Sequence, residues 1–325
     1  MSGRLLLLLT AAGTGLSCSG PQSALVSAGE DAAQIQNLFT VMTVGALIVW
    51  AAVVAIAVYT IRVGESHSQR AAEFLIIGGG VVAPTIVLGA LIAFGMPLVP
   101  SVLAVPSTGE FSIDVTAKQW WWRIHYRTPD GVVETANELR LPVGQRVALR
   151  LSSPDVIHSF WVPSLAGKMD MIPGRTTHLG LEPRQTGTFR GACAEYCGAS
   201  HALMAFSVVV VEADDFRAWL DGQARPAISP ADPSAARGAE AFTANGCSAC
   251  HTIRGTAAAG RIGPDLTHVG GRLRIAAETL PNNPEAVARW IGQADRFKPG
   301  VHMPAFRGLA SDELSAIAAY LSSLK

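Results

Sequence analysis

Apolar residues are concentrated in two long stretches near the N-terminus. No charged residue occurs between positions 32 and 61, and none occurs between positions 74 and 109. Each stretch exceeds the ~20 residues that a helix needs to cross the hydrocarbon core of a membrane. The pattern therefore predicts a transmembrane helical hairpin over residues 32–100.

The charges that flank this hairpin predict its orientation. Arg62 and Arg70 lie in the short polar loop between the two stretches, whereas Glu30 and Asp31 precede the first. Because basic loops stay in the cytoplasm, the rest of the chain is expected on the outer face. Residues 1–17 have the layout of a secretory signal peptide. Cys18 follows it and is a candidate for lipidation, although an ordinary signal peptide with an incidental cysteine has the same layout.

The pattern changes after the hairpin. β-rich segments separated by Pro/Gly turns predict a β-sandwich or barrel, with a domain at residues 108–214. A stretch rich in proline, alanine and serine over residues 222–236 has the composition of a linker. Residues 237–325 read as an all-helical domain with its last helix at residues 311–324.

Composition narrows the function classes. The formal net charge is zero and charged residues make up 15% of the chain, so nothing points to nucleic acid. The chain has five cysteines: Cys18, Cys193, Cys197, Cys247 and Cys250. An odd number with two close pairs suggests metal ligation or covalent attachment.

The first cysteine pair belongs to a dense group of soft ligands. Cys193, Cys197, His201 and Met204 lie within twelve residues, and His158 stands 35 residues upstream. Thiolate and imidazole suit copper or zinc, and a weak thioether favours copper in electron transfer. Two cysteines four residues apart could bridge two ions. A disulfide, a structural zinc site and, for His158, a satisfied core histidine are the competing interpretations.

The second cysteine pair forms a haem-attachment motif. Cys247, Cys250 and His251 match C-x-x-C-H, in which two thiols attach the haem and the histidine ligates its iron. A redox dithiol is the alternative. Met303 is the only methionine after Met204 and is the expected sixth ligand, with His268 and His302 as alternatives. A Met/His pair raises the reduction potential of a haem and suits an electron carrier.

Together these motifs resemble cytochrome c oxidase subunit II with a fused C-terminal cytochrome c domain, the caa3-type arrangement. The resemblance implies a cupredoxin-like fold whose binuclear copper centre (CuA) is bridged by Cys193 and Cys197. The terminal ligands that it implies are the side chains of His158, His201 and Met204 and the carbonyl of Glu195. The Glu195 carboxylate is a candidate magnesium ligand at the interface with the catalytic subunit.

The resemblance implies further roles outside the ligand set. Trp120 begins a tryptophan run that resembles the aromatic stretch of this family, where the first tryptophan faces the electron donor; ordinary packing is the alternative. Glu73 is the nearest candidate for the acidic residue at a proton pathway, but its spacing to Pro84 departs from the pattern. Residues 235–325 resemble a class I cytochrome c domain, in which Pro264 steadies the proximal histidine and Trp290 bonds a haem propionate.

The expected function is electron transfer in a bacterial plasma membrane. The chain would pass electrons from soluble or membrane-bound cytochrome c, or a cytochrome bc complex, through haem c and two copper ions to subunit I, which reduces oxygen. Subunit III is a further expected partner. A nitric oxide reductase-type or nitrous oxide reductase enzyme is the alternative, and so is a copper carrier. The intact copper ligands argue against a quinol oxidase, and the bridging motif and fused haem argue against a carrier.

Overall fold

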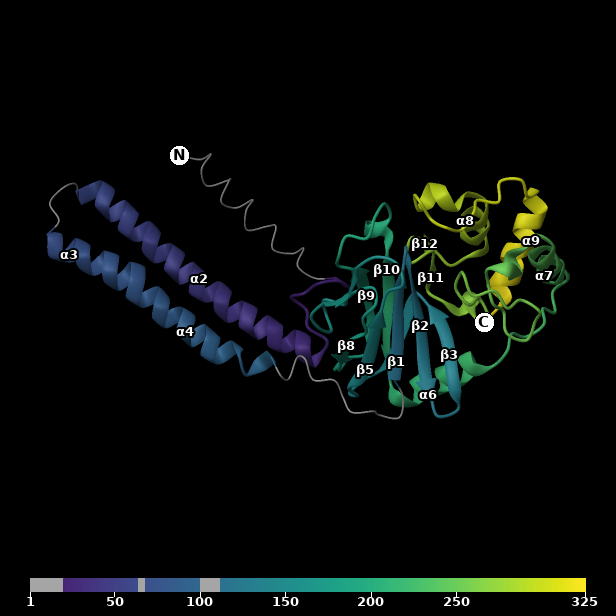
Figure 1. The fold of residues 1–325 in the computed structure, drawn as a ribbon, viewed down its shortest axis with the longest axis horizontal. Helices are drawn as coiled ribbons and strands as arrows, with labels where there is room; N and C mark the ends of the chain where they lie inside the picture. The colour runs from purple at the N-terminus through teal and green to yellow at the C-terminus, as the bar shows by residue number, and fades with distance from the viewer. Residues whose placement is uncertain (1–19, 64–67, 100–111) are drawn as a thin grey trace, which may run out of the picture.

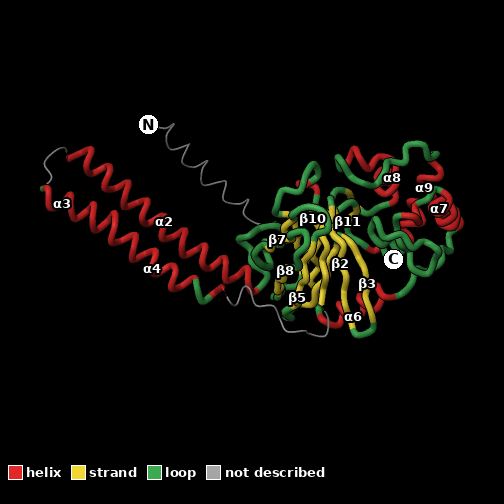
Figure 2. Tube along the Cα trace, viewed as in Figure 1, coloured by secondary structure: helices red, strands yellow, loops and turns green. Residues whose placement is uncertain are grey.

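The computed structural model describes residues 20–63, 68–99 and 112–325 and divides them among a helical pair, a β-sandwich and a helical domain (Figure 1). Cys18 and the expected signal peptide lie outside the described residues. Figure 2 shows helices at both ends of the chain and strands in the middle. This is the predicted multidomain fold: a helical hairpin, a cupredoxin-like sandwich and a helical cytochrome c domain.

The N-terminal helices are predominantly apolar, apart from one short polar helix. They are α2 (Glu30–Val63), the short α3 (Gln69–Glu73), the π-helical η2 (Phe74–Val82) and α4 (Ala83–Gly95). By length and composition, residues 30–62 and 69–95 could each cross a membrane, and none of either apolar window is buried. A helix that is apolar all round needs a core or a lipid environment, because water would leave its whole surface unfavourably exposed.

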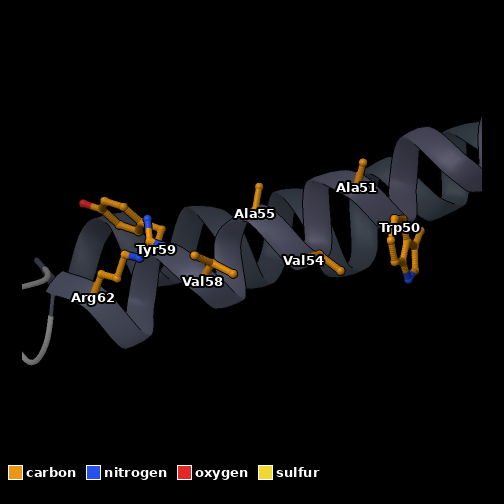
Figure 3. A pocket seen from close by; sticks show the side chains of 7 residues that line it. All are labelled: Trp50, Ala51, Val54, Ala55, Val58, Tyr59 and Arg62. Carbon is orange, nitrogen blue, oxygen red and sulfur yellow. The ribbon is translucent and has the colours of Figure 1, made fainter. Parts of the chain in front are cut away.

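One groove along these helices lies on α2. Its lining side chains are Trp50, Ala51, Val54, Ala55, Val58, Tyr59 and Arg62 (Figure 3). All come from one helix, so the groove has a single wall and is part of the exposed apolar surface. Glu73, at the end of α3, is exposed and accepts a hydrogen bond only from Gln69, at 3.2 Å, among the described contacts.

The start of α2 is fastened to the β-sandwich. Arg146 donates to both carboxylate oxygens of the buried Asp31, at 3.2 and 3.1 Å. Glu30 pairs with Arg184. Gly29 lies so close to Leu165 that a β-carbon would come 2.3 Å from its carbonyl oxygen. These contacts hold the sandwich at one end of the helical pair.

Two five-stranded sheets make the sandwich. The first has the order β3-β2-β1-β5-β8, and the second has the order β4-β10-β9-β6-β7. The strands of the first sheet are β1 (Ser112–Lys118), β2 (Trp121–Thr128), β3 (Gly131–Ala136), β5 (Val147–Ser152) and β8 (Thr177–Leu181). Those of the second are β4 (Glu138–Pro142), β6 (His158–Trp161), β7 (Met169–Met171), β9 (Gly187–Cys193) and β10 (Ala205–Val211).

Alternation of side chains along these strands builds the core. In β1 every second residue is buried, so one face of the sheet turns inward. Trp122 packs edge-on to Phe160, with ring centroids 5.9 Å apart, and against Phe206 at 4.9 Å. Gly191 faces the same rings, because a β-carbon there would lie 2.1 Å from Phe206. This rigid aromatic core supports the end of the sandwich where β6, β9 and β10 meet.

Helices are the main regular secondary structure of the C-terminal domain. They are α7 (Pro233–Ala244), α8 (Pro284–Phe297) and α9 (Ser311–Ser323), with the one-turn η4 (Cys247–Ala249) and η5 (Val269–Gly271). Asp232 caps α7 and Asn283 caps α8 through their side chains. A β-carbon at Gly238 of α7 would lie 2.0 Å from the Ala316 carbonyl, which explains a glycine at that crossing. The small pair β11 (Arg274–Ile275) and β12 (Leu280–Pro281) was not foreseen.

The segment between the two folded domains is shorter than the expected linker. Helix α6 (Ala213–Ala224) packs Phe216 and Leu220 on the sandwich and takes up the first residues of the 222–236 stretch. Helix α7 takes up the last residues of that stretch. Residues 225–232 remain between the two helices.

Candidate metal and haem centres

The soft ligands converge where β9 ends. Cys193 closes β9, and its amide donates to the Met204 carbonyl at 3.0 Å, so residues 194–203 form a closed loop before β10. β6 pairs with β9 and begins at His158. Pairing of β6 with β9, rather than proximity in the sequence, therefore brings His158 to the loop.

Distances among the side chains describe a compact cluster. The Sγ atoms of Cys193 and Cys197 are 3.8 Å apart. Nδ1 of His158 lies 3.7 Å from Cys193 Sγ, and Nδ1 of His201 lies 3.5 Å from Cys197 Sγ. The sulfur of Met204 is 3.8 Å from Cys197 Sγ. Two central sulfurs, each flanked by an imidazole, suit a pair of copper ions.

Glu195 contributes to the cluster through its main chain. Its carbonyl oxygen lies 3.2 Å from Cys193 Sγ, while its carboxylate turns outward, 3.7 Å from the Lys168 ammonium group. The two cysteines are free thiols, and their separation far exceeds the ~2.05 Å of a disulfide bond. A zinc site with four ligands would not use all the donors of this cluster, which has two thiols, two imidazoles, a thioether and a carbonyl.

Asp155 orients His158 and was not singled out in the sequence. Its carboxylate binds Nε2 of the fully buried His158 at 2.8 Å, so that Nδ1 faces the sulfurs. The backbone amides of Gln119 and Val156 also donate to this carboxylate, at 2.8 and 2.7 Å. An outer carboxylate that fixes the ring of a ligating histidine is typical of metal centres. The only sequence signal was an aspartate three residues before the histidine.

Electrostatics in the cluster make the two thiols differ in acidity. Burial opposes ionisation of Asp155, but the hydrogen bonds of His158 and the backbone outweigh it and lower its pKa to about 2. Burial also disfavours charged His158, yet Asp155 and Cys193 raise its pKa to about 9. The hydrogen bond from Cys197 lowers the pKa of Cys193 to about 4, and the same contact with burial raises that of Cys197. One thiolate is thus available to a metal at neutral pH.

Trp120 and Gln119 hold the ligand loop from the first sheet. Trp120 is 6% exposed, and its indole Nε1 donates to the Cys197 carbonyl at 3.0 Å. The Gln119 side-chain amide donates to the same oxygen at 2.7 Å. Trp120 therefore contacts the main chain of an expected bridging ligand directly, which distinguishes it from a tryptophan of the general core.

The haem-attachment motif forms one helical turn. The amides of Cys250 and His251 both donate to the Cys247 carbonyl, at 3.2 and 3.0 Å. His251 Nδ1 bonds the Pro264 carbonyl at 2.8 Å, which leaves Nε2 for iron. Burial lowers the pKa of His251, so the imidazole is neutral, as ligation requires. These donors fit a covalently attached haem.

The residues expected to complete the haem site, Met303 and Trp290, lie at the hydrophobic core of the C-terminal domain. Met303 and Trp290 are half-buried against the second hydrophobic cluster. His268 Nε2 is engaged with the Arg225 carbonyl at 3.0 Å, and the ring of the exposed His302 faces Trp120. Both alternative ligands therefore have other contacts, and Met303 remains the favoured sixth ligand.

The fold and these donors define the class: an electron-transfer protein with a copper-binding cupredoxin-like domain and a c-type haem domain, carried by apolar helices. The model of the cytochrome c oxidase subunit II periplasmic domain matches residues 126–213, and the cytochrome c model matches residues 235–325. The chain therefore belongs, domain by domain, to the subunit II and cytochrome c families.

Known relatives agree with this assignment. "Cytochrome c oxidase subunit 2" of Alkalihalophilus pseudofirmus is 40% identical over 66% of this chain and 61% of its own length. The protein of that name from Bacillus sp. (strain PS3) is 35% identical over 66% and 62%. The chain thus spans about three fifths of these relatives.

A solved structure is also similar, the periplasmic domain of subunit II of cytochrome oxidase (CoxB) of Bradyrhizobium japonicum. It is 33% identical, with a TM-score of 0.34, over 37% of this chain and 97% of that one. The resemblance read from the sequence motifs is confirmed by the two domain matches and the named relatives.

Proposed function

We propose that this chain is the electron-transferring subunit of an aerobic haem–copper oxidase. The observation that carries the proposal is the pair of cysteine sulfurs 3.8 Å apart, each flanked by a histidine Nδ1. When bound, the haem and the copper pair each take up and release one electron without making or breaking bonds of a substrate. Electrons would pass from cytochrome c or a membrane donor through the haem to the copper pair, and then to a catalytic subunit.

Residues of this chain would hold both the copper ions and the haem. Cys193 and Cys197 would bridge two copper ions, with His158, His201, Met204 and the Glu195 carbonyl as terminal ligands. The Asp155 carboxylate holds one imidazole in position, and the buried setting resists ligand movement. Rigid ligation keeps the reorganisation that accompanies electron transfer small. Cys247 and Cys250 would attach the haem, with His251 and Met303 as its axial ligands.

The proposed location follows from the helical pair. Residues 30–62 and 69–95 would each cross the bacterial plasma membrane, with the Arg62 end of α2 on the cytoplasmic side. Both metal domains would then face outward, above the catalytic subunit. The Glu195 carboxylate, about half exposed beside Lys168, would be available to a magnesium ion at that interface. Subunit III completes the proposed assembly.

Purification of the intact complex tests the proposal. In this chain, apart from the copper of the catalytic subunit, we expect two copper ions for each haem c, a near-infrared band and a multi-line copper resonance from a mixed-valence pair. The co-purifying catalytic subunit should consume oxygen when reduced cytochrome c is supplied. One copper ion per haem c in this chain at full ligand occupancy would refute the binuclear centre, and turnover of nitric oxide but not oxygen by the complex would refute the oxidase.

A further inference from the structure

The haem domain contacts the copper domain through the loop that contains Met303. In this loop, residues 298–303, Lys298 is 2% exposed and its ammonium group donates to the Trp120 carbonyl at 2.5 Å. It also donates to the Ala276 carbonyl of its own domain, at 3.3 Å. Ser200, beside the copper ligand His201, donates to the Pro299 carbonyl at 2.7 Å. A buried ammonium group needs such acceptors, because desolvation without them is costly.

The same loop covers the Trp120 ring. Gly300 has a φ of +78°, and a β-carbon there would lie 3.0 Å from Cη2 of Trp120. The ring of His302 lies 6.2 Å from the Trp120 ring, centroid to centroid. With these neighbours, Trp120 keeps only 6% of its surface exposed. The face that the family resemblance assigns to an electron donor is therefore occupied by this chain's own haem domain.

A second contact reaches the opposite side of the expected haem site. Arg123, three residues after Trp120, donates to the carbonyls of Arg261 and Gly263, at 2.6 and 3.0 Å. Gly263 directly precedes Pro264, whose carbonyl holds His251. The copper domain thus contacts the loop of the proximal histidine with Arg123 and the loop of Met303 with Trp120.

The end of α6 and the first part of the connecting segment are bound to the haem domain. Arg254 of the haem domain donates to the carbonyls of Gln223 and Ala224, at 2.6 and 3.1 Å. The amide of Ala227 donates to the Arg254 carbonyl at 2.8 Å. The expected linker is therefore a folded connection, and it restrains the haem domain at the position that the other contacts define.

We infer that the haem domain is seated on the Trp120 face in the resting protein, with Lys298 and Arg123 as its positioning residues. A donor protein outside the chain then reaches the copper ligands only by way of the haem domain. The seating depends on the contacts above; its consequence for electron delivery rests on the proposed function.

Lysine acetylation of the full-length protein tests the seating without reference to activity. The chain has four lysines, Lys118, Lys168, Lys298 and Lys325, so mass spectrometry can follow each one. Lys168 and Lys325 are exposed and serve as internal references. We expect Lys298 to be labelled about tenfold or more slowly than Lys325, because acetylation must wait for the domains to separate. Equal rates would overturn the inference.

Two variants test the contact, one on each of the two domains. Gly300→Asn tolerates the left-handed backbone but adds atoms against Trp120, and it should raise Lys298 labelling about tenfold. Its control is Gly174→Asn, at the same φ of +78° with open space around it. Arg123→Gln should have a similar effect and, being on the copper domain, leaves the fold of the haem domain intact. The haem spectrum checks folding, and continued protection of Lys298 in both variants would overturn the inference.

A separate measurement distinguishes this inference from the proposed function. In the intact oxidase, the rate of electron arrival at copper after rapid reduction of the haem should not depend on solvent viscosity if the domain is already seated. A rate that falls with viscosity would overturn the seating. Protection of Lys298 without electron transfer to copper would instead refute the proposed function and leave the seating standing.

Discussion

The indole nitrogen of Trp120, in the turn between β1 and β2, donates a hydrogen bond of 3.0 Å to the carbonyl oxygen of Cys197, in the loop after β9. Gln119 donates to the same oxygen at 2.7 Å. The expected bridging ligand is thus held at its main chain by the first sheet, while its sulfur faces the second. Trp120 also lies beneath the haem domain, so one side chain contacts both the copper-ligand loop and the loop that contains Met303.

Replacing Trp120 with phenylalanine should remove this hydrogen bond and keep most of the aromatic packing. Loss of a single buried hydrogen bond predicts about 1 kcal/mol of lost stability, measured by thermal unfolding. Electron transfer from haem to copper should also slow. Trp121→Phe is the control, because that ring is packed by Lys118 and Arg123 away from Cys197. Identical effects of the two substitutions would contradict a specific role for Trp120.

Asp155→Asn should weaken copper binding. The neutral amide no longer fixes the charge and tautomer of His158, and loss of an outer-shell carboxylate typically costs about 10–100-fold in metal affinity. Competition with a chelator measures this change. Asp130→Asn, at an exposed turn, should leave the affinity unaltered. Equal affinity in both variants would show that His158 needs no orienting partner.

Copper-free protein should contain an acidic thiol. Since Cys197 lowers the pKa of Cys193 to about 4, one thiolate persists at neutral pH and is lost only as the pH falls through that value. The ultraviolet absorption of the thiolate follows this titration. In a Cys197→Ser variant the remaining thiol should titrate closer to the ordinary value of 9.0. Two thiols titrating together near that value in the unaltered chain would contradict the prediction.

Met303→Ala should leave the haem covalently attached through Cys247 and Cys250 but change its spin state. Without the thioether, the iron loses its sixth protein ligand and the reduction potential should fall. Absorption and resonance spectra measure the spin state. His302→Ala and His268→Ala should retain the original spectrum, and an unchanged spin state in Met303→Ala would remove that residue as a ligand.

Gly263→Ala should disturb the proximal histidine. The new β-carbon would lie 2.5 Å from Cε1 of His251, so the ring or the loop must move. Overpacking of this kind costs about 1–3 kcal/mol, and haem content per chain should fall with it. Gly271→Ala is the matched control, since its nearest neighbour would be 3.9 Å away. Full haem content in Gly263→Ala would show that the ring can shift without loss.

The sequence by itself predicted the class of each domain and the candidate ligands of both centres. Cys193, Cys197, His201 and Met204 lie on one short loop, and Cys247, Cys250 and His251 lie on one turn, so local spacing was enough to predict their ligand sets. The apolar stretches likewise predicted the helical pair, because their length and hydrophobicity can be recognised without knowing any tertiary contact.

Tertiary structure decided how distant residues meet, although the family resemblance had already placed His158 at the copper cluster. Pairing of β6 with β9 brings His158 to Cys193, and the first sheet brings Trp120 to the Cys197 carbonyl. Burial of Lys298 against Trp120 joins residues 178 positions apart. Such contacts depend on strand register and domain docking, which arise from the packing of whole surfaces. The spacing of residues along the chain therefore does not reveal these contacts.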